Sequence, residues 1–368
     1  MAPYRAFISY SHEEQEIEAA VRSALEHRGL VAWSSGDLAP NLTGFTEQIQ
    51  THIAHSHVFV PILTPNSHKR GWVHQEIGYA VAMKVPIVPV CIGKLPAGMI
   101  QGHEGVKLQH VDQLHTAFDK VRFETLVEAA GRDWRPLSED APEPEDRAAM
   151  LERCATDARN FLGSPQCVRQ AGGFSSFSIP DEPPDHVKWR ARWPKAPRGV
   201  AARKLLRRER QALEWHAQRA GCRLIVNIGL DTDKEYGAGS KHARTLALLQ
   251  FLESLRPDPS QVQVALLEKY YQHSLLVVGD WFVAESRAGR IGSGYQQTLF
   301  TAHAPSVTRR LAEFDHEILG YLEEQDVAPG DSLAVAIDRL RAVVPSLPRY
   351  PQLADGPSTA PTSGLRSD

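Results

Sequence analysis

An aromatic ring and a carboxylate lie four residues apart in the stretch GWVHQEIGYA, at Trp72 and Glu76. The stretch follows an apolar run and a turn, which predicts the start of a helix, and residues four apart share one face of a helix. Val73 and Ile77 begin an apolar stripe that would dock this helix on a core. An aromatic beside one acid could hold a planar ring and place a carboxylate next to it. The alternative is structural: a tryptophan that packs the helix and a glutamate that faces solvent.

Strand and helix patterns alternate around this stretch. Predicted strands cover residues 6–10, 30–33, 58–63, 85–90 and 108–111, and helices are predicted from residue 11 or 12, from 45, from 71 and over 114–130. Such alternation predicts a doubly wound α/β sheet with parallel strands, whose carboxyl ends share one edge. Ser9-Tyr10-Ser11, the loop 34–44 and the helix entrance at 71 should meet there. No GxGxxG or GxxxxGK[ST] follows a strand, which argues against a dinucleotide or P-loop site.

Four boxes in this order resemble Toll/interleukin-1 receptor (TIR) domains over about residues 4–130. FISYS at residues 7–11 resembles the first box of the family, and residues 33–44 resemble its second strand and long loop. Residues 56–63 resemble its third strand. GWVHQE at residues 71–76 resembles the W-x-x-x-E motif of TIR enzymes. Ser35 stands where the family often has an acid, and Gly71 stands where a serine commonly precedes the tryptophan.

The resemblance implies a flavodoxin-like fold and an NAD+ nucleosidase of the bacterial effector type, which cleaves the bond between nicotinamide and ribose. It implies that Glu76 is the catalytic residue. The substrate contacts that it implies are Ser9, Tyr10, Ser35, Asp37, Leu38 and Trp72. NAD+ is then the substrate, and no cofactor or metal is expected. The leaving group is neutral, so a single carboxylate that stabilises an oxocarbenium-like state can suffice. The sequence leaves open whether the product is linear or cyclic ADP-ribose.

Structural alternatives exist for the predicted contacts. Ser9 and Tyr10 could form an ordinary strand end, and Asp37 could be a solvated carboxylate in a turn.

Composition argues against nucleic-acid-binding, membrane and secreted proteins. The chain has 368 residues and a formal net charge of −3, so neither nucleic acid nor a membrane surface is an expected partner. No apolar run is long enough for a bilayer span, and the N-terminus has no signal-peptide core, so we expect a cytoplasmic protein. The cysteines form no CxxC pair, which fits a reducing compartment; they are Cys91, Cys154, Cys167 and Cys222.

The sequence predicts four regions. They are a TIR domain at 1–132, a linker and irregular connecting region at 133–200, a second α/β domain at 201–345, and a disordered tail at 346–368. In the second domain, a hairpin is predicted across Gly279-Asp280. A basic run lies on a helix at 198–220, where a solvated face, a phosphate-bearing ligand and an acidic neighbouring subunit are the alternatives.

Two further features of the second domain could bind ligands. The Gly/Ser-rich loop at 237–240 precedes a helix and could offer N–H groups to a phosphate. Asp231 with Asp233, or Asp280 with His303, could contact a ligand, although solvated turn carboxylates are the simpler interpretation.

We expect an NAD+-consuming effector of antiphage defence, by analogy with bacterial TIR enzymes. Its second domain would respond to a nucleotide or protein activator or drive assembly into an oligomer or filament. One alternative is a non-catalytic adaptor that acts through TIR–TIR contacts. Another is a nucleotide-processing enzyme with its chemistry in the second half, where no catalytic constellation is evident.

Overall fold

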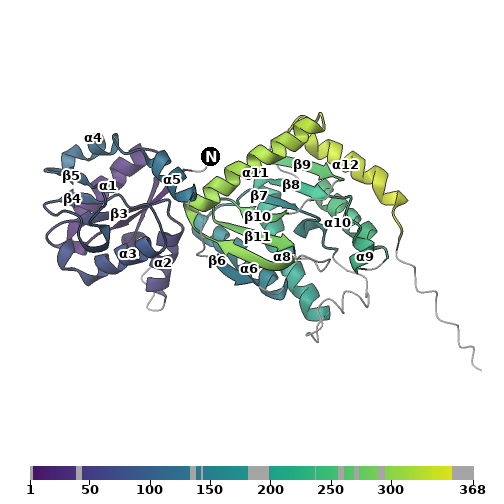
Figure 1. The fold of residues 1–368 in the computed structure, drawn as a ribbon, viewed down its shortest axis with the longest axis horizontal. Coiled ribbons are helices and arrows are strands. Elements are labelled where there is room, and N and C mark those ends of the chain that lie inside the picture. Colours follow the sequence, from purple (N-terminus) through teal and green to yellow (C-terminus); the bar gives the residue numbers. More distant parts are fainter. Residues whose placement is uncertain are drawn as a thin grey trace, which may run out of the picture.

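The structure is a computed structural model, and two β-sheets that lie side by side organise it (Figure 1). It describes residues 3–38, 44–132, 138–141, 144–180, 199–236, 238–255, 261–268, 273–288 and 295–349. One sheet belongs to the N-terminal third of the chain, and the other belongs to the remainder. Each sheet carries helices on both faces, so the chain contains two α/β domains.

The N-terminal sheet has five strands in the order β2-β1-β3-β4-β5. All its paired strands are parallel, as alternating strands and helices predict. The strands are β1 (Arg5–Ser9), β2 (Val31–Ser34), β3 (Val58–Leu63), β4 (Val90–Ile92) and β5 (Val106–Leu108). The helices are α1 (Gln15–His27), α2 (Phe45–Ala54), α3 (Gly71–Ala82), α4 (Leu114–Phe118) and α5 (Phe123–Arg132). The predicted doubly wound sheet is therefore confirmed.

Side chains along β1 alternate between two cores. Ala6, Ile8 and Tyr10 pack with residues of α1, α4 and α5, whereas Phe7 packs with residues of α2 and α3. This period of two is the geometry of a pleated strand. It places Ser9, the next residue on the side of Phe7, on the face that α3 covers.

Two predicted elements of this domain differ from the structure. The predicted strand at 85–90 is reduced to β4 and an isolated bridge between Phe59 and Ile87, because Pro86 and Pro89 have no N–H to donate to a strand ladder. The predicted helix at 114–130 is split into α4 and α5 by residues 119–122.

The second sheet has seven strands in the order β6-β12-β11-β10-β7-β8-β9. They are β6 (Ser138–Ala141), β7 (Val168–Gly172), β8 (Cys222–Asn227), β9 (Val262–Leu267), β10 (His273–Val278), β11 (Phe282–Ala288) and β12 (Tyr295–Thr301). Strands β7, β8 and β9 are parallel, and the others pair antiparallel. The predicted hairpin across Gly279-Asp280 is β10–β11.

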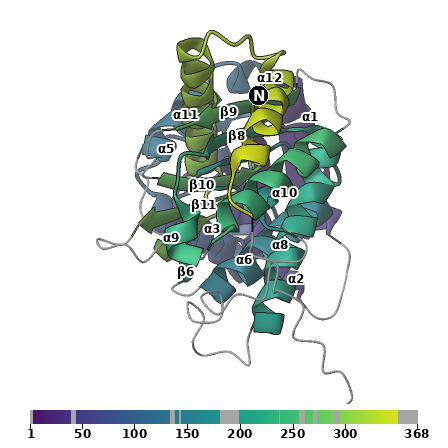
Figure 2. The same cartoon turned by 90° about the vertical axis from the view of Figure 1, so that its right-hand side faces the viewer.

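Helices cover both faces of the second sheet. One core contains residues of α6 (Pro144–Leu162), α8 (Gly199–Ala220), α10 (Ser240–Ser254) and α12 (Ser332–Val343). The other contains residues of α11 (Ala304–Glu324), which lies on the opposite side in Figure 2. A short helix, α9 (Thr232–Tyr236), precedes α10.

The predicted division of the chain at residue 200 does not follow this sheet. Strands β6 and β7 and helix α6 come from the predicted connecting region, yet they belong to the second domain. Residues 133–137, 142–143 and 181–198 of that region lie outside the described residues, as do 350–368 of the predicted tail. Two arginines of the basic run on α8 pair with acids of the same chain, Arg208 with Glu152 of α6 and Arg210 with Glu214.

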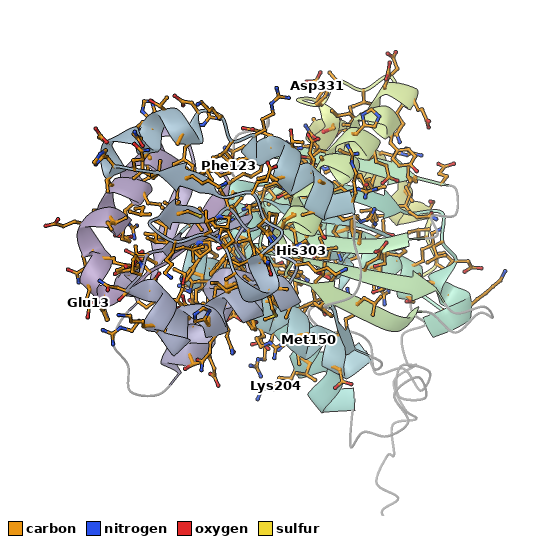
Figure 3. The ribbon with its side chains drawn as sticks, turned by 60° about the vertical axis from the view of Figure 1, so that its left-hand side comes forward. Glu13, Phe123, Met150, Lys204, His303 and Asp331 are labelled. Atoms are coloured by element: carbon orange, nitrogen blue, oxygen red, sulfur yellow. The ribbon has the colours of Figure 1, made fainter. Side chains whose placement is uncertain are left out.

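A buried ion pair joins the two domains. Arg5 at the start of β1 and Asp280 in the β10–β11 turn are 4% and 6% exposed. Arg5 Nη1 lies 2.5 Å from Asp280 Oδ2, and its Nη2 donates to the Asp280 carbonyl at 3.2 Å. Asp280 is therefore a residue of the junction between the domains. It is not the solvated turn carboxylate that was one prediction, and it does not form the predicted ligand contact with His303. His303 bonds instead to the Lys84 carbonyl, also across the junction (Figure 3).

Aromatic rings surround this ion pair. The His55 ring stacks on Trp281 at 3.6 Å between centroids, and Phe161 stacks on Trp281 at 5.3 Å. Burial and the Arg5 cation hold the pKa values of His55 and His57 well below their usual range. The junction is thus formed by neutral rings around one compensated pair of charges.

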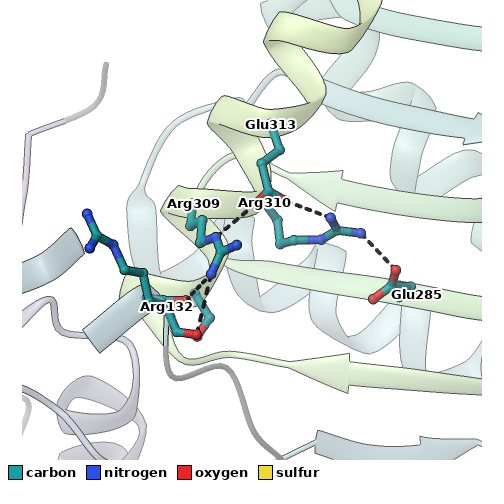
Figure 4. A pocket seen from close by; sticks show the side chains of 7 residues that line it. Arg132, Glu285, Arg309, Arg310 and Glu313 are labelled. Atoms are coloured by element: carbon teal, nitrogen blue, oxygen red, sulfur yellow. Dashed lines mark hydrogen bonds and ion pairs between the residues drawn. The ribbon is translucent and has the colours of Figure 1, made fainter. Parts of the chain in front are cut away.

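A pocket of about 360 Å3 lies beside the junction, between the end of α5 and the first turns of α11 (Figure 4). Its charged groups largely bond to one another: Arg310 pairs with Glu285 and Glu313, and Arg309 pairs with Glu313. Gly131 allows the close approach of the two helices, because a Cβ at that position would lie 2.7 Å from the Pro305 carbonyl oxygen. Among the described residues, no helix is both long and apolar enough to cross a membrane.

We predict that Asp280→Asn lowers the free energy of unfolding by about 3–5 kcal/mol, because Arg5 keeps its charge in a buried site. Chemical denaturation of the full chain measures this. Glu253→Gln, which removes one of the two carboxylate partners of the exposed Arg341, should lower the free energy of unfolding by less than about 1 kcal/mol. If both variants lower the free energy of unfolding by the same amount, the Arg5–Asp280 pair does not stabilise the junction.

Candidate active site at the carboxyl edge of the N-terminal sheet

Helix α3 brings Glu76 to the carboxyl edge of the N-terminal sheet. The helix begins at Gly71, after the extended residue Arg70. Val73, Ile77 and Ala80 dock it on the core of the α2–α3 face. Glu76 lies one residue from this stripe and is only 5% exposed, whereas Trp72 is 37% exposed. The glutamate is therefore the buried member of the pair, and the predicted solvated glutamate is excluded.

The Glu76 carboxylate is only partly hydrogen-bonded. Ser9, the last residue of β1, donates its hydroxyl to Oε2. Oε1 is buried and accepts no hydrogen bond from any described residue. A buried carboxylate oxygen without a donor is costly, so a site of this kind calls for a functional explanation.

Burial raises the pKa of Glu76 from its usual 4.5 to about 7, although hydrogen bonds from Ser9 and Trp72 act in the opposite direction. No cation is among the causes of this shift. The carboxyl group therefore changes its charge near neutral pH, which is typical of groups in active sites.

A second polar cluster joins the strand ends beside this site. Glu14 accepts hydrogen bonds from the Thr64 hydroxyl and the Ser11 N–H. Ser67 in turn accepts from the Thr64 N–H at 2.8 Å. These contacts join the turn after β1 to the turn that leads into α3. The prediction did not include them, although Ser11-x-x-Glu14 has the spacing of a helix capping box.

The predicted contacts do not all lie together. Ser9 and Trp72 contact Glu76, and Leu38 packs on the same core as α3. Tyr10 belongs to the α1 core, and a Cβ on Gly36 would lie 3.0 Å from its hydroxyl.

Asp37 likewise faces α1. It accepts hydrogen bonds from Arg22 and the Ser34 N–H, each at 2.7 Å. Ser35 is half-buried and begins the short turn Ser35–Asp37. The structure therefore brings Ser9, Trp72 and Leu38 to the Glu76 face and leaves Tyr10 and Asp37 on the other. Residues 39–43 of the predicted loop lie outside the described residues.

The described part of the chain holds no group of three or more His, Cys, Asp or Glu side chains placed to bind a metal ion. Glu76, Ser9 and Trp72 could instead act directly on an organic substrate, with one carboxylate and two hydrogen-bond donors.

Comparison with known families identifies this domain. The sequence profile of the TIR domain family matches residues 6–127, which include β1, α3 and the Glu76 edge. The N-terminal domain of this chain is a TIR domain. Among solved structures, the chain is similar to the TIR domain of the Toll-related receptor TRR-2 from Hydra magnipapillata, with 18% identity and a TM-score of 0.28. That match covers 33% of this chain and 96% of the receptor domain. The comparison with curated proteins found no match.

The second domain contacts the TIR domain away from Glu76. Its contacts reach Arg5 at the start of β1, His57 before β3 and Lys84 before β4. These residues lie at the amino ends of the strands, whereas Ser9 and Glu76 lie at the carboxyl edge. These three contacts therefore lie away from Glu76, and Trp33 of β2 also packs against the core of the second domain.

We predict that Glu76→Gln stabilises the chain at pH 8 but not at pH 4. The folded pKa of about 7 exceeds the usual 4.5, so ionisation of the native carboxylate opposes folding as pH rises through this range. The difference is worth about 3 kcal/mol at most. Urea unfolding of both proteins at the two pH values measures it. Glu16→Gln, at an exposed glutamate of α1, is the control, and an equal response of both variants would contradict the raised pKa.

Proposed function

We propose that the TIR domain is an NAD+ glycohydrolase and that Glu76 is its catalytic residue. The observation that carries this proposal is the buried Glu76 carboxylate, with one oxygen bonded to Ser9, the other without a partner and a pKa of about 7. A purely structural glutamate would be expected to pair both oxygens. Glu76 Oε1 can accept a hydrogen bond from a hydroxyl group of the substrate ribose.

The proposed reaction breaks the bond between C1′ of the ribose and the nicotinamide nitrogen. Nicotinamide leaves as a neutral molecule, so no general acid is needed, and the ribose develops oxocarbenium character. The ionised Glu76 stabilises this positive charge. Attack of water at C1′ gives ADP-ribose and releases one proton, and attack of an adenine nitrogen gives cyclic ADP-ribose. Trp72 supplies an aromatic wall beside the reacting sugar.

The enzyme is proposed to be regulated. Both carboxylate oxygens of Glu76 are covered in this state, because the residue is 5% exposed and Oε1 is buried. The site must open before NAD+ can reach it, as is common for gated enzymes. We assign the switch to the second domain, which would bind a nucleotide or protein activator or drive oligomer or filament formation. Such a gated cytoplasmic NADase fits a bacterial effector of antiphage defence.

A scaffold that acts through TIR–TIR contacts is the second candidate function. Two large apolar side chains favour it, since Leu95 and Met99 are 62% and 65% exposed. A Cβ on Gly78 would lie 3.3 Å from the Met99 methyl group, so Met99 lies against α3, the helix that carries Glu76. Exposed apolar groups of this kind often contact a partner.

We predict that the purified full chain consumes NAD+ when concentrated or supplied with candidate nucleotides, and that Glu76→Ala lowers kcat/KM at least about 100-fold. Because the ionised form acts, wild-type kcat/KM should fall about tenfold per pH unit below pH 7. Chromatographic quantification of nicotinamide measures both effects, with Glu16→Gln as the control. Equal turnover in the wild type and Glu76→Ala would remove Glu76 from catalysis. Absence of turnover under every condition would favour the scaffold.

We predict that Trp72→Ala lowers NAD+ turnover about tenfold while the free energy of unfolding changes by less than about 1 kcal/mol, since the ring is partly exposed. Trp72→Phe keeps a ring but removes the N–H that bonds to Glu76. It should shift the acid limb of the pH profile to higher pH. A large loss of stability in Trp72→Ala would instead assign this residue to the core.

A further inference from the structure

Two buried hydroxyl groups in the second domain have no hydrogen-bond partner among the side chains and backbone groups that the structure describes. Thr232 begins α9, Ser240 begins α10, and each residue is 1% exposed. Neither Thr232 Oγ1 nor Ser240 Oγ bonds to any described residue. An unsatisfied buried hydroxyl costs about 1–3 kcal/mol. Two of them at the starts of successive helices indicate that a further acceptor belongs there.

A hydrogen bond between the flanking residues brings these helix starts together. The Lys241 N–H donates to Asp233 Oδ1 at 2.8 Å. The N-cap of α10 is Gly239, with φ of 81°, a conformation that favours glycine. Gly239 has no side chain with which to cap the helix, and the Asp233 carboxylate caps the Lys241 N–H in its place. Because α10 spans 15 residues, its N-terminus carries a substantial positive partial charge.

Cationic side chains surround this helix start. Lys241 and Arg244 lie in the first turns of α10, and the positive charge of Arg349 acts on His242. The Arg244 guanidinium lies 5.8 Å from the centre of the Phe174 ring, which follows β7. Asp233 is the acid that bonds to this turn, while Asp231 pairs with Lys234 at 3.3 Å. Among the described side chains at this helix start, positive charge therefore exceeds negative charge.

We propose that the start of α10 is a binding site for the phosphate group of a small phosphorylated ligand. The Ser240 and Thr232 hydroxyls donate to phosphate oxygens, the helix N-terminus and Arg244 neutralise the charge, and Phe174 flanks the ligand. Both orphaned hydroxyls then gain acceptors. This site deepens the proposed regulation by an activator, and only its regulatory meaning rests on the proposed function.

Calorimetry and thermal melting of the full chain, at constant ionic strength, test the site with inorganic phosphate, AMP and adenosine. Phosphate and AMP at up to about 20 mM should raise the melting temperature by mass action, and adenosine should not. Stronger binding of AMP than of phosphate would identify a nucleotide as the ligand class. Absence of any response to phosphate and AMP would overturn the proposal.

Variants separate this role from a structural one. Ser240→Ala and Thr232→Val remove unpartnered groups, so the ligand-free melting temperature should stay the same or rise, while phosphate affinity falls about tenfold. Arg244→Gln should weaken binding similarly. Arg341→Gln removes the same charge near the far end of α10, where Arg341 pairs with Glu253, and should leave binding unchanged. Wild-type affinity in Ser240→Ala with Thr232→Val, or equal losses in Arg244→Gln and Arg341→Gln, would overturn the site.

The assay does not depend on NAD+ turnover, so Glu76→Gln should bind phosphate as the wild type does. An inactive TIR domain with normal phosphate binding would overturn the proposed function and leave this site in place. NAD+ turnover without phosphate binding would overturn this site and leave the proposed function in place.

Discussion

The ion pair between Arg5 and Asp280 fixes how the two halves of the chain meet. Both side chains are almost fully buried, and each would be an expensive isolated charge. Arg5 also donates its Nε to the His55 carbonyl and its backbone N–H to His57 Nδ1. A single guanidinium thus joins the start of β1, the segment before β3 and the β10–β11 turn. The amino edge of the TIR sheet is thereby part of the junction, and Glu76 lies at the opposite edge.

Glu76 and Asp280 illustrate how burial acts on two carboxylates with different neighbours. Asp280 has a guanidinium at 2.5 Å, so its charge is compensated and serves to join domains. Glu76 has only neutral donors, Ser9 and Trp72, and its pKa is raised by burial. An uncompensated buried carboxylate is poorly suited to stabilise a fold but well suited to respond to a developing positive charge. The contrast supports a reactive role for Glu76.

The two domains are also connected through a shared side chain. Trp33 in β2 packs against the core of α2 and α3 and against the large core of the second domain. It lies two residues before the short turn Ser35–Asp37, which Leu38 follows. A rearrangement of the second domain could therefore act on this turn through packing alone. Close-packed interiors transmit such displacements because they contain little free volume.

The sequence by itself predicted a doubly wound parallel sheet with Glu76 on a helix at its carboxyl edge. That prediction depends on local periodicity and on the common edge of parallel strands, both of which are readable from neighbouring residues. The TIR family was indicated separately, by the resemblance of four short boxes to that family. Only the tertiary structure decided that Glu76 is buried against Ser9 and that Tyr10 and Asp37 face α1 instead. It also revealed that Asp280 meets Arg5 and that β6 and β7 complete the second sheet. The physical reason is that burial and long-range pairing depend on which distant segments cover a residue, and no local pattern encodes that.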